Sequence, residues 1–137
     1  MNTFYLEHAN ITVNDLDHAM HFFKTAFPHF ELRGGGESNG RKWIHFGDAT
    51  TYVALNTTLE EKHIEKNYEC SGINHLGFVV SNAEDIAKRL SEAGYERSFP
   101  KQKEQFRIRE YFYDADGNEY EFVQYLSEKE SERNAYT

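Results

Sequence analysis

Several features are scarce in this chain of 137 residues, and each scarcity excludes something. Cys70 is the single cysteine, so no internal disulfide can form, and a reducing cytoplasm is the expected location. No apolar run approaches the length of a membrane span, and Met1–Tyr5 lacks the basic and apolar regions of a signal peptide. Basic residues are outnumbered, and the net charge of −8 argues against nucleic acid as a partner.

What the sequence contains is a repeat of one half in the other. His8–Val13 resembles His75–Val80, at an offset of 75 − 8 = 67 residues. The same offset continues without a gap to Glu121, whose counterpart is 121 − 67 = 54, an alanine. Two histidines and one carboxylate therefore fall at matching points of the repeat, while the fourth point, Ala54, carries no ligand atom. On this alignment His45 corresponds to a phenylalanine and faces away from the histidines.

Hydrophobic periodicity predicts a strand, a helix and three strands in each copy. The predicted strands are residues 6–13, 29–33, 41–47 and 51–57, then 73–80, 95–99, 107–113 and 118–125, with helices at 15–27 and 82–93. Three glycines at 34–36 are interpreted as a loop, and the polar segment 59–71 as a short helix or a loop.

This pattern predicts an α+β fold in which two βαβββ modules form a curled, mostly antiparallel sheet, a cup with its helices on the outer face. We expect a single domain over residues 1–137, divided into module one (4–57), a linker (58–71), module two (72–126) and a polar tail (127–137). The acidic run at 128–132 is interpreted as a solvated part of that tail.

Strand alternation places His8 and His75 on the face opposite the residues that pack under the helices. One such histidine is more often a hydrogen-bonded core or surface residue, but two at equivalent positions favour a shared role. The segment Asp114–Gly117 is typical of a hairpin turn with glycine in the left-handed region. A three-residue loop there would pair Tyr111 with Glu121 and bring both onto the concave face.

Two imidazoles and one carboxylate suit a divalent Fe, Mn, Co, Ni or Zn ion, and three protein ligands leave open positions for a substrate. His8, His75 and Glu121 are therefore the predicted metal ligands. On the same face, Arg107 or Arg109 would hold an anionic substrate group, and Tyr111 would donate or accept a proton. The alternative for the two arginines is an exposed strand face with solvated charges.

Three motifs, Leu6–Asp15, Ile73–Val80 and Tyr111–Phe122, resemble the vicinal oxygen chelate superfamily, also called the glyoxalase/bleomycin-resistance/dioxygenase family. The resemblance covers roughly residues 4–126. It implies paired βαβββ modules and the same three metal ligands, His8, His75 and Glu121.

Two departures from family patterns narrow the expected chemistry. Glyoxalase I-like members carry a fourth protein ligand at the position of Ala54, and fosfomycin-modifying members carry a Ser/Gly-rich loop where this chain has Lys101–Arg107. Extradiol dioxygenases, which use the same three ligands for Fe(II), are usually longer and add a catalytic His or Tyr. We expect a metal-dependent enzyme of the glyoxalase/dioxygenase type, a lyase, an isomerase or an extradiol-type dioxygenase, acting on a small oxygen-chelating substrate.

Two alternatives stay open at this point. One is a metal-free protein that sequesters a small molecule, as bleomycin-resistance proteins do, and the other is a scaffold in which the three ligands are a relic. As single-chain members of this size often dimerise, we also expect a homodimer.

Overall fold

The computed structural model of the chain describes residues 3–60 and 68–135. The chain divides into two compact units, Met1–Ile64 and Glu65–Thr137, which we call module one and module two and describe each by itself. Half of the predicted linker, residues 61–67, lies outside the described residues. No helix in the described part of the chain is long and apolar enough to span a membrane.

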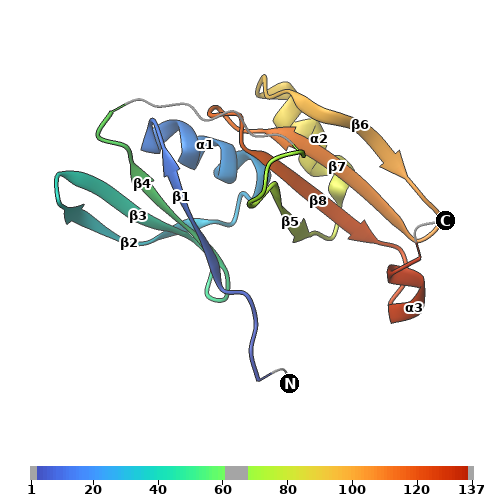
Figure 1. Cartoon of the computed structure of the whole chain (residues 1–137). Helices are drawn as coiled ribbons and strands as arrows, with labels where there is room; N and C mark the ends of the chain where they lie inside the picture. Colours follow the sequence, from blue (N-terminus) through green and yellow to red (C-terminus); the bar gives the residue numbers. More distant parts are fainter. Residues whose placement is uncertain (1–2, 61–67, 136–137) are drawn as a thin grey trace. The chain divides into compact units, whose positions relative to one another are not determined.

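Each module has the predicted order of strand, helix and three strands (Figure 1). Module one contains β1 (His8–Val13), α1 (Leu16–Ala26), β2 (Glu31–Ser38), β3 (Arg41–Gly47) and β4 (Tyr52–Thr57). Module two contains β5 (His75–Val79), α2 (Ala83–Glu92), β6 (Arg97–Lys103), β7 (Arg107–Tyr113), β8 (Glu119–Tyr125) and α3 (Glu130–Arg133). The result is two separate four-stranded sheets, in the orders β1-β4-β3-β2 and β5-β8-β7-β6. The first strand of each pairs in parallel with the last, and the other pairings are antiparallel. The predicted α+β class is confirmed.

The two main helices begin and end where the sequence predicts, for local reasons. The side chain of Asp15 accepts a hydrogen bond from the backbone N–H of His18 at 2.9 Å, and Asn82 caps α2 through Asp85 at 3.0 Å. Gly94 follows α2 with φ +93°, a left-handed conformation that suits glycine after a helix. Each helix buries one apolar face against its own sheet, α1 against β4 and α2 against β7 and β8.

The three glycines expected to form a loop lie within β2 instead, and that prediction is wrong. Gly35 and Gly36 pair with Ile44 and Trp43 on β3. A Cβ at Gly36 would lie 3.1 Å from the indole of Trp43, so the strand is glycine-rich where a large ring rests on it. The predicted strand 95–99 also differs, because β6 starts at Arg97 and continues to Lys103 as an edge strand that tolerates Pro100.

The predicted register at the end of module two is confirmed. Tyr111 pairs with Glu121 and Tyr113 with Glu119, so these four side chains share one face of the sheet. The intervening residues Tyr120 and Phe122 are buried under α2 as expected. The turn depends on Gly117, whose φ is +77°, and on the carboxylate of Asp114, which accepts backbone hydrogen bonds at 2.9 Å.

The alignment of the two copies needs a one-residue shift in β3, so our placement of His45 is wrong. The pair Gly47/Tyr52 encloses residues 48–51, whereas the matching pair Tyr113/Glu119 encloses residues 114–118, one residue more. His45 therefore corresponds to Tyr111, pairs with Ala54, and stacks on Tyr52 with ring centroids 4.6 Å apart. It lies on the same face as His8 and not behind the sheet.

Candidate functional site

His75, at the first position of β5, has one ring nitrogen held and the other directed at a carboxylate. Its Nδ1 lies 2.8 Å from Oδ1 of Asn74, and because that oxygen only accepts, Nδ1 carries the proton. The lone pair of the neutral ring is then on Nε2, which lies 3.9 Å from Oε1 of Glu121. Metal-binding histidines are commonly oriented by an acceptor on the second nitrogen in this way.

His8 in module one has the same arrangement with a different neighbour. Its Nδ1 lies 2.9 Å from Oε1 of Glu7, again the residue that precedes the histidine. The hydrogen bond to His8 lowers the pKa of the Glu7 carboxyl, which keeps it an ionised acceptor. The imidazole also stacks on Tyr52, at 4.6 Å between centroids and 17° between planes. Both copies of the repeat therefore fix their histidine through the preceding side chain and leave Nε2 without a hydrogen bond among the described residues.

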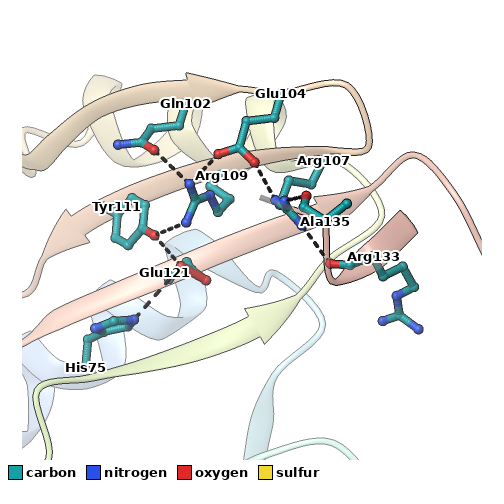
Figure 2. Close-up of polar contacts among 9 residues, drawn as sticks. All are labelled: His75, Gln102, Glu104, Arg107, Arg109, Tyr111, Glu121, Arg133 and Ala135. Carbon is teal, nitrogen blue, oxygen red and sulfur yellow. Dashed lines mark hydrogen bonds and ion pairs between the residues drawn. The ribbon is translucent and has the colours of Figure 1, made fainter. Parts of the chain in front are cut away.

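Glu121 lies in the middle of β8, and its carboxylate is held from the neighbouring strand. The phenol of Tyr111 donates a hydrogen bond to Oε1 of Glu121 (Figure 2). Burial raises the pKa of Tyr111 well above its usual value, and the contact with Glu121 raises it further, so the phenol stays protonated and acts as a donor. On the other side, Gly77 of β5 faces Glu121, and even a Cβ there would lie no closer than 3.5 Å to Oε2. The second carboxylate oxygen is thus left open.

A second layer of polar groups supports Tyr111. Nη1 of Arg109 donates to the phenol oxygen at 3.2 Å, and Nη2 donates to Gln102 at 2.8 Å and to Glu104 (Figure 2). Burial alone would raise the pKa of Glu104, but the hydrogen bonds and charges of Arg107 and Arg109 lower it below its ordinary value. The carboxylate therefore stays charged and holds the guanidinium of Arg109 within hydrogen-bond distance of Tyr111.

Arg107, one of the two arginines expected to hold a substrate anion, uses its guanidinium within the protein. Its side chain is 1% exposed and donates to Glu104 at 2.6 Å, to the carbonyl of Arg133 at 2.6 Å, and to the carbonyl of Ala135. These carbonyls belong to α3 and the residues after it, so the predicted tail contains a short docked helix. The acidic side chains of Glu128 and Glu130 are exposed, as expected. The guanidinium of Arg133 in turn lies 4.1 Å from the ring centre of Tyr125.

Glu119 is a carboxylate to which the sequence analysis gave no role. It is buried, lies 3.5 Å from Nδ1 of His75, and accepts a hydrogen bond from the phenol of Tyr68 at 2.5 Å. Burial and then the contact with Glu119 raise the pKa of Tyr68 to about 12. The signal for Glu119 was its position two residues before Glu121 on the same strand face, whereas Tyr68 lies in a segment with no periodic pattern.

The predicted residues are therefore distributed over both modules. Module two brings together His75, Glu121, Tyr111 and Arg109, whereas His8 and Ala54 belong to module one, where Ala54 is buried between His45 and Asn10 on neighbouring strands. Among the described residues, neither module by itself gathers three His, Cys, Asp or Glu side chains that could hold a metal ion.

Two side chains of module two are nevertheless close enough to bind one ion together. Ligand atoms about 2.1 Å from a metal can lie up to about 4.2 Å apart, so the 3.9 Å between Nε2 of His75 and Oε1 of Glu121 is within reach.

Comparison with known proteins agrees with this arrangement of modules. The sequence profile of the Glyoxalase/Bleomycin resistance protein/Dioxygenase superfamily matches residues 5–122. The chain belongs to this superfamily. Among curated protein sequences, none matches the chain.

Solved structures show the same fold at low sequence identity. A glyoxylase/bleomycin resistance protein/dioxygenase domain from Frankia sp. EAN1pec is 21% identical, with a TM-score of 0.76, over 90% of this chain and 99% of that one. The fosfomycin resistance protein FosX from Mesorhizobium loti is 22% identical, with a TM-score of 0.71, over 97% and 98% of the two chains. A mutant of FosX from Listeria monocytogenes, complexed with Mn(II) and 1S,2S-dihydroxypropylphosphonic acid, is 20% identical, with a TM-score of 0.73, over 98% and 100%.

Proposed function

We propose that this protein is a metal-dependent enzyme in which His8, His75 and Glu121 bind one divalent ion and the substrate is a small molecule with two neighbouring oxygen atoms. The observation that carries the proposal is the matched orientation of the two histidines, each with Nδ1 bonded to the preceding side chain and Nε2 left for a ligand. The buried alanine at position 54 adds no fourth ligand, which leaves coordination positions for the substrate. Mn(II) is the first metal to test, because the FosX structure with a similar fold contains it.

When bound, such an ion supplies Lewis-acid stabilisation of negative charge on the substrate oxygens. The chain's own residues then have separate tasks. Tyr111 donates a hydrogen bond to Glu121 and fixes the carboxylate, and its raised pKa keeps it a protonated donor at neutral pH and not a general base. We assign Arg109 to positioning Tyr111 and Arg107 to holding the C-terminal segment, in place of the substrate-anion role expected from the sequence, because both guanidinium groups already have protein acceptors.

The test is calorimetric titration of Mn(II), and then of Fe(II), Co(II), Ni(II) and Zn(II), into protein purified without a chelator or a metal-charged column. We expect one ion per chain, and a loss of affinity of at least about a hundredfold in His8→Ala, His75→Ala and Glu121→Gln. The control is His18→Ala, which removes an exposed histidine on α1. Absence of micromolar binding for every metal, or unchanged binding in His75→Ala, would refute the proposal and favour a metal-free binding protein.

A further inference from the structure

Module one contains a pocket of about 440 Å³ that the proposed metal chemistry does not use. It is lined by Asn10, Ser38, Asn39, Arg41, Trp43, Asn56 and Leu59. None of these residues is a proposed metal ligand, and all belong to module one. The volume falls within the roughly 300–1,000 Å³ of small-molecule sites.

Two local features form this pocket: the tight turn between β2 and β3, and the glycines of β2. Asn39 and Gly40 have φ of +53° and +76°, a two-residue turn between β2 and β3 that sets Ser38 opposite Arg41 (Figure 1). Gly36 lies opposite Trp43, and its missing side chain makes room for the indole, since a Cβ would lie 3.1 Å from the ring. The glycines of β2 therefore allow the indole of Trp43 to lie at the pocket wall.

Three of the polar groups around the pocket are donors that have no acceptor among the described residues. Asn56 donates to Oδ1 of Asn10 at 2.7 Å and accepts from Thr12 at 3.1 Å, so the amide oxygens of both asparagines are occupied. The amide N–H₂ of Asn10, the indole N–H of Trp43 and the guanidinium of Arg41 make no hydrogen bond or ion pair with any residue in the described ranges 3–60 and 68–135. All three of these groups can only donate.

This composition selects a ligand by its chemistry. A guanidinium pairs with an oxyanion, often through two hydrogen bonds, and an indole face takes a flat ring. The chain as a whole has a net charge of −8 and repels anions, so an anion would need a local positive charge such as the guanidinium of Arg41. We propose that this pocket, which we call the module-one pocket, is a binding site for a planar or aromatic molecule that carries a carboxylate.

The pocket has a defined place relative to one proposed metal ligand. Asn10 follows His8 by two residues on β1, and the two side chains lie on the same face of the strand. If one substrate occupies both sites, its metal-chelating oxygens would lie near His8. Its ring and carboxylate would lie further along β1, in the pocket beside Asn10. The binding itself does not depend on the proposed metal, so the two proposals can be tested apart.

Trp43 is the single tryptophan of the chain, so its fluorescence reports on this pocket alone. The full-length protein is titrated with benzoate in the presence of EDTA, with benzyl alcohol as the uncharged analogue. We expect a saturable change with benzoate, retained in His75→Ala, and an affinity about tenfold lower in Arg41→Gln, because a charge-assisted hydrogen bond is lost. Lys42→Gln removes the same charge one residue further along β3, on the opposite face, and should bind as the wild type does.

Three outcomes would overturn the inference. The first is no saturable change with benzoate, and the second is equal affinity for benzyl alcohol. The third is an equal loss in Arg41→Gln and Lys42→Gln, which would reduce the effect to general charge. Circular dichroism of each variant establishes that the fold is unchanged, which is expected because Arg41 and Lys42 are exposed.

Discussion

The C-terminal segment offers the sharpest test of the polar network in module two. The change is Arg107→Met, which keeps an unbranched apolar stem and removes every donor. The arginine is 1% exposed and donates to two carbonyls of the segment and to Glu104. The variant removes the bonds that hold residues 133–135 to β7, but Glu104 keeps its contact with Arg109 and is not left as an unpaired charge.

The magnitude follows from these contacts. Each hydrogen bond from a charged group contributes about 1.5–3 kcal/mol, and breaking a buried pair costs about 3–5 kcal/mol when the remaining charge has no other partner. Because Glu104 retains Arg109 and the desolvation cost of Arg107 disappears, we expect a loss of about 2–4 kcal/mol in the free energy of unfolding. In urea this is a decrease of about 1–2 M in the midpoint.

The assay combines urea denaturation with amide hydrogen exchange of the last ten residues. Exchange there should accelerate in Arg107→Met, because α3 has four residues and cannot persist undocked. The control is Lys129→Ala in the same segment, whose side chain is 78% exposed and pairs with Glu132 at 3.4 Å. It should cost less than about 0.5 kcal/mol. A midpoint and an exchange pattern in Arg107→Met that match those of Lys129→Ala would refute the docking role.

Three further predictions concern the ligands, the pH profile and the assembly. Asn74→Ala, which removes the acceptor at Nδ1 of His75, should lower metal affinity about 10–100-fold in the same titration, and an unchanged affinity would contradict the proposed orientation. Backbone hydrogen bonds from Thr51 and Thr50 lower the pKa of Asp48 below its ordinary value, so its contribution to stability is present at pH 7 and is lost as the pH falls through the lowered value. Wild type should therefore exceed Asp48→Asn in stability at pH 7, with the difference shrinking below about pH 4, and a pH-independent difference in urea unfolding would be inconsistent with this cause. Light scattering should give the mass of a homodimer, and a monomer at working concentration would exclude it.

Local signals sufficed for most of the fold. The order of strands and helices follows from periodicity and from caps such as Asp15 and Asn82, which act within a few residues. The register of β7 and β8 was accessible because Asp114–Gly117 is a turn with a recognisable glycine position. Once that turn was placed, the pairing of Tyr111 with Glu121 followed from strand geometry alone.

Other features depend on contacts between residues that are far apart in the sequence, and local patterns do not predict them. The hairpin of residues 48–51 is one residue shorter than its counterpart, and a shift of one residue moves a side chain to the other face, which is why His45 was misplaced. Gly36 is an ordinary loop signal until Trp43 is seen to rest on it from the next strand. Arg107 was placed on the correct face, but its partners, 26 and 28 residues further along the chain, become visible only in three dimensions.

The two histidine environments show what comparison of the copies alone misses. Aligned residue by residue, Glu7 and Asn74 differ in charge and length, and the pair would count as an unrelated substitution. Structurally, each offers one acceptor oxygen within 3 Å of the following imidazole, and each leaves Nε2 without a hydrogen bond in the part of the chain that the structure describes. The repeat therefore keeps a hydrogen-bonding function where it has not kept a residue. The proposed metal site would require one particular ring nitrogen in each copy, whereas strand packing alone does not require it, because packing depends on shape and not on which nitrogen carries the proton.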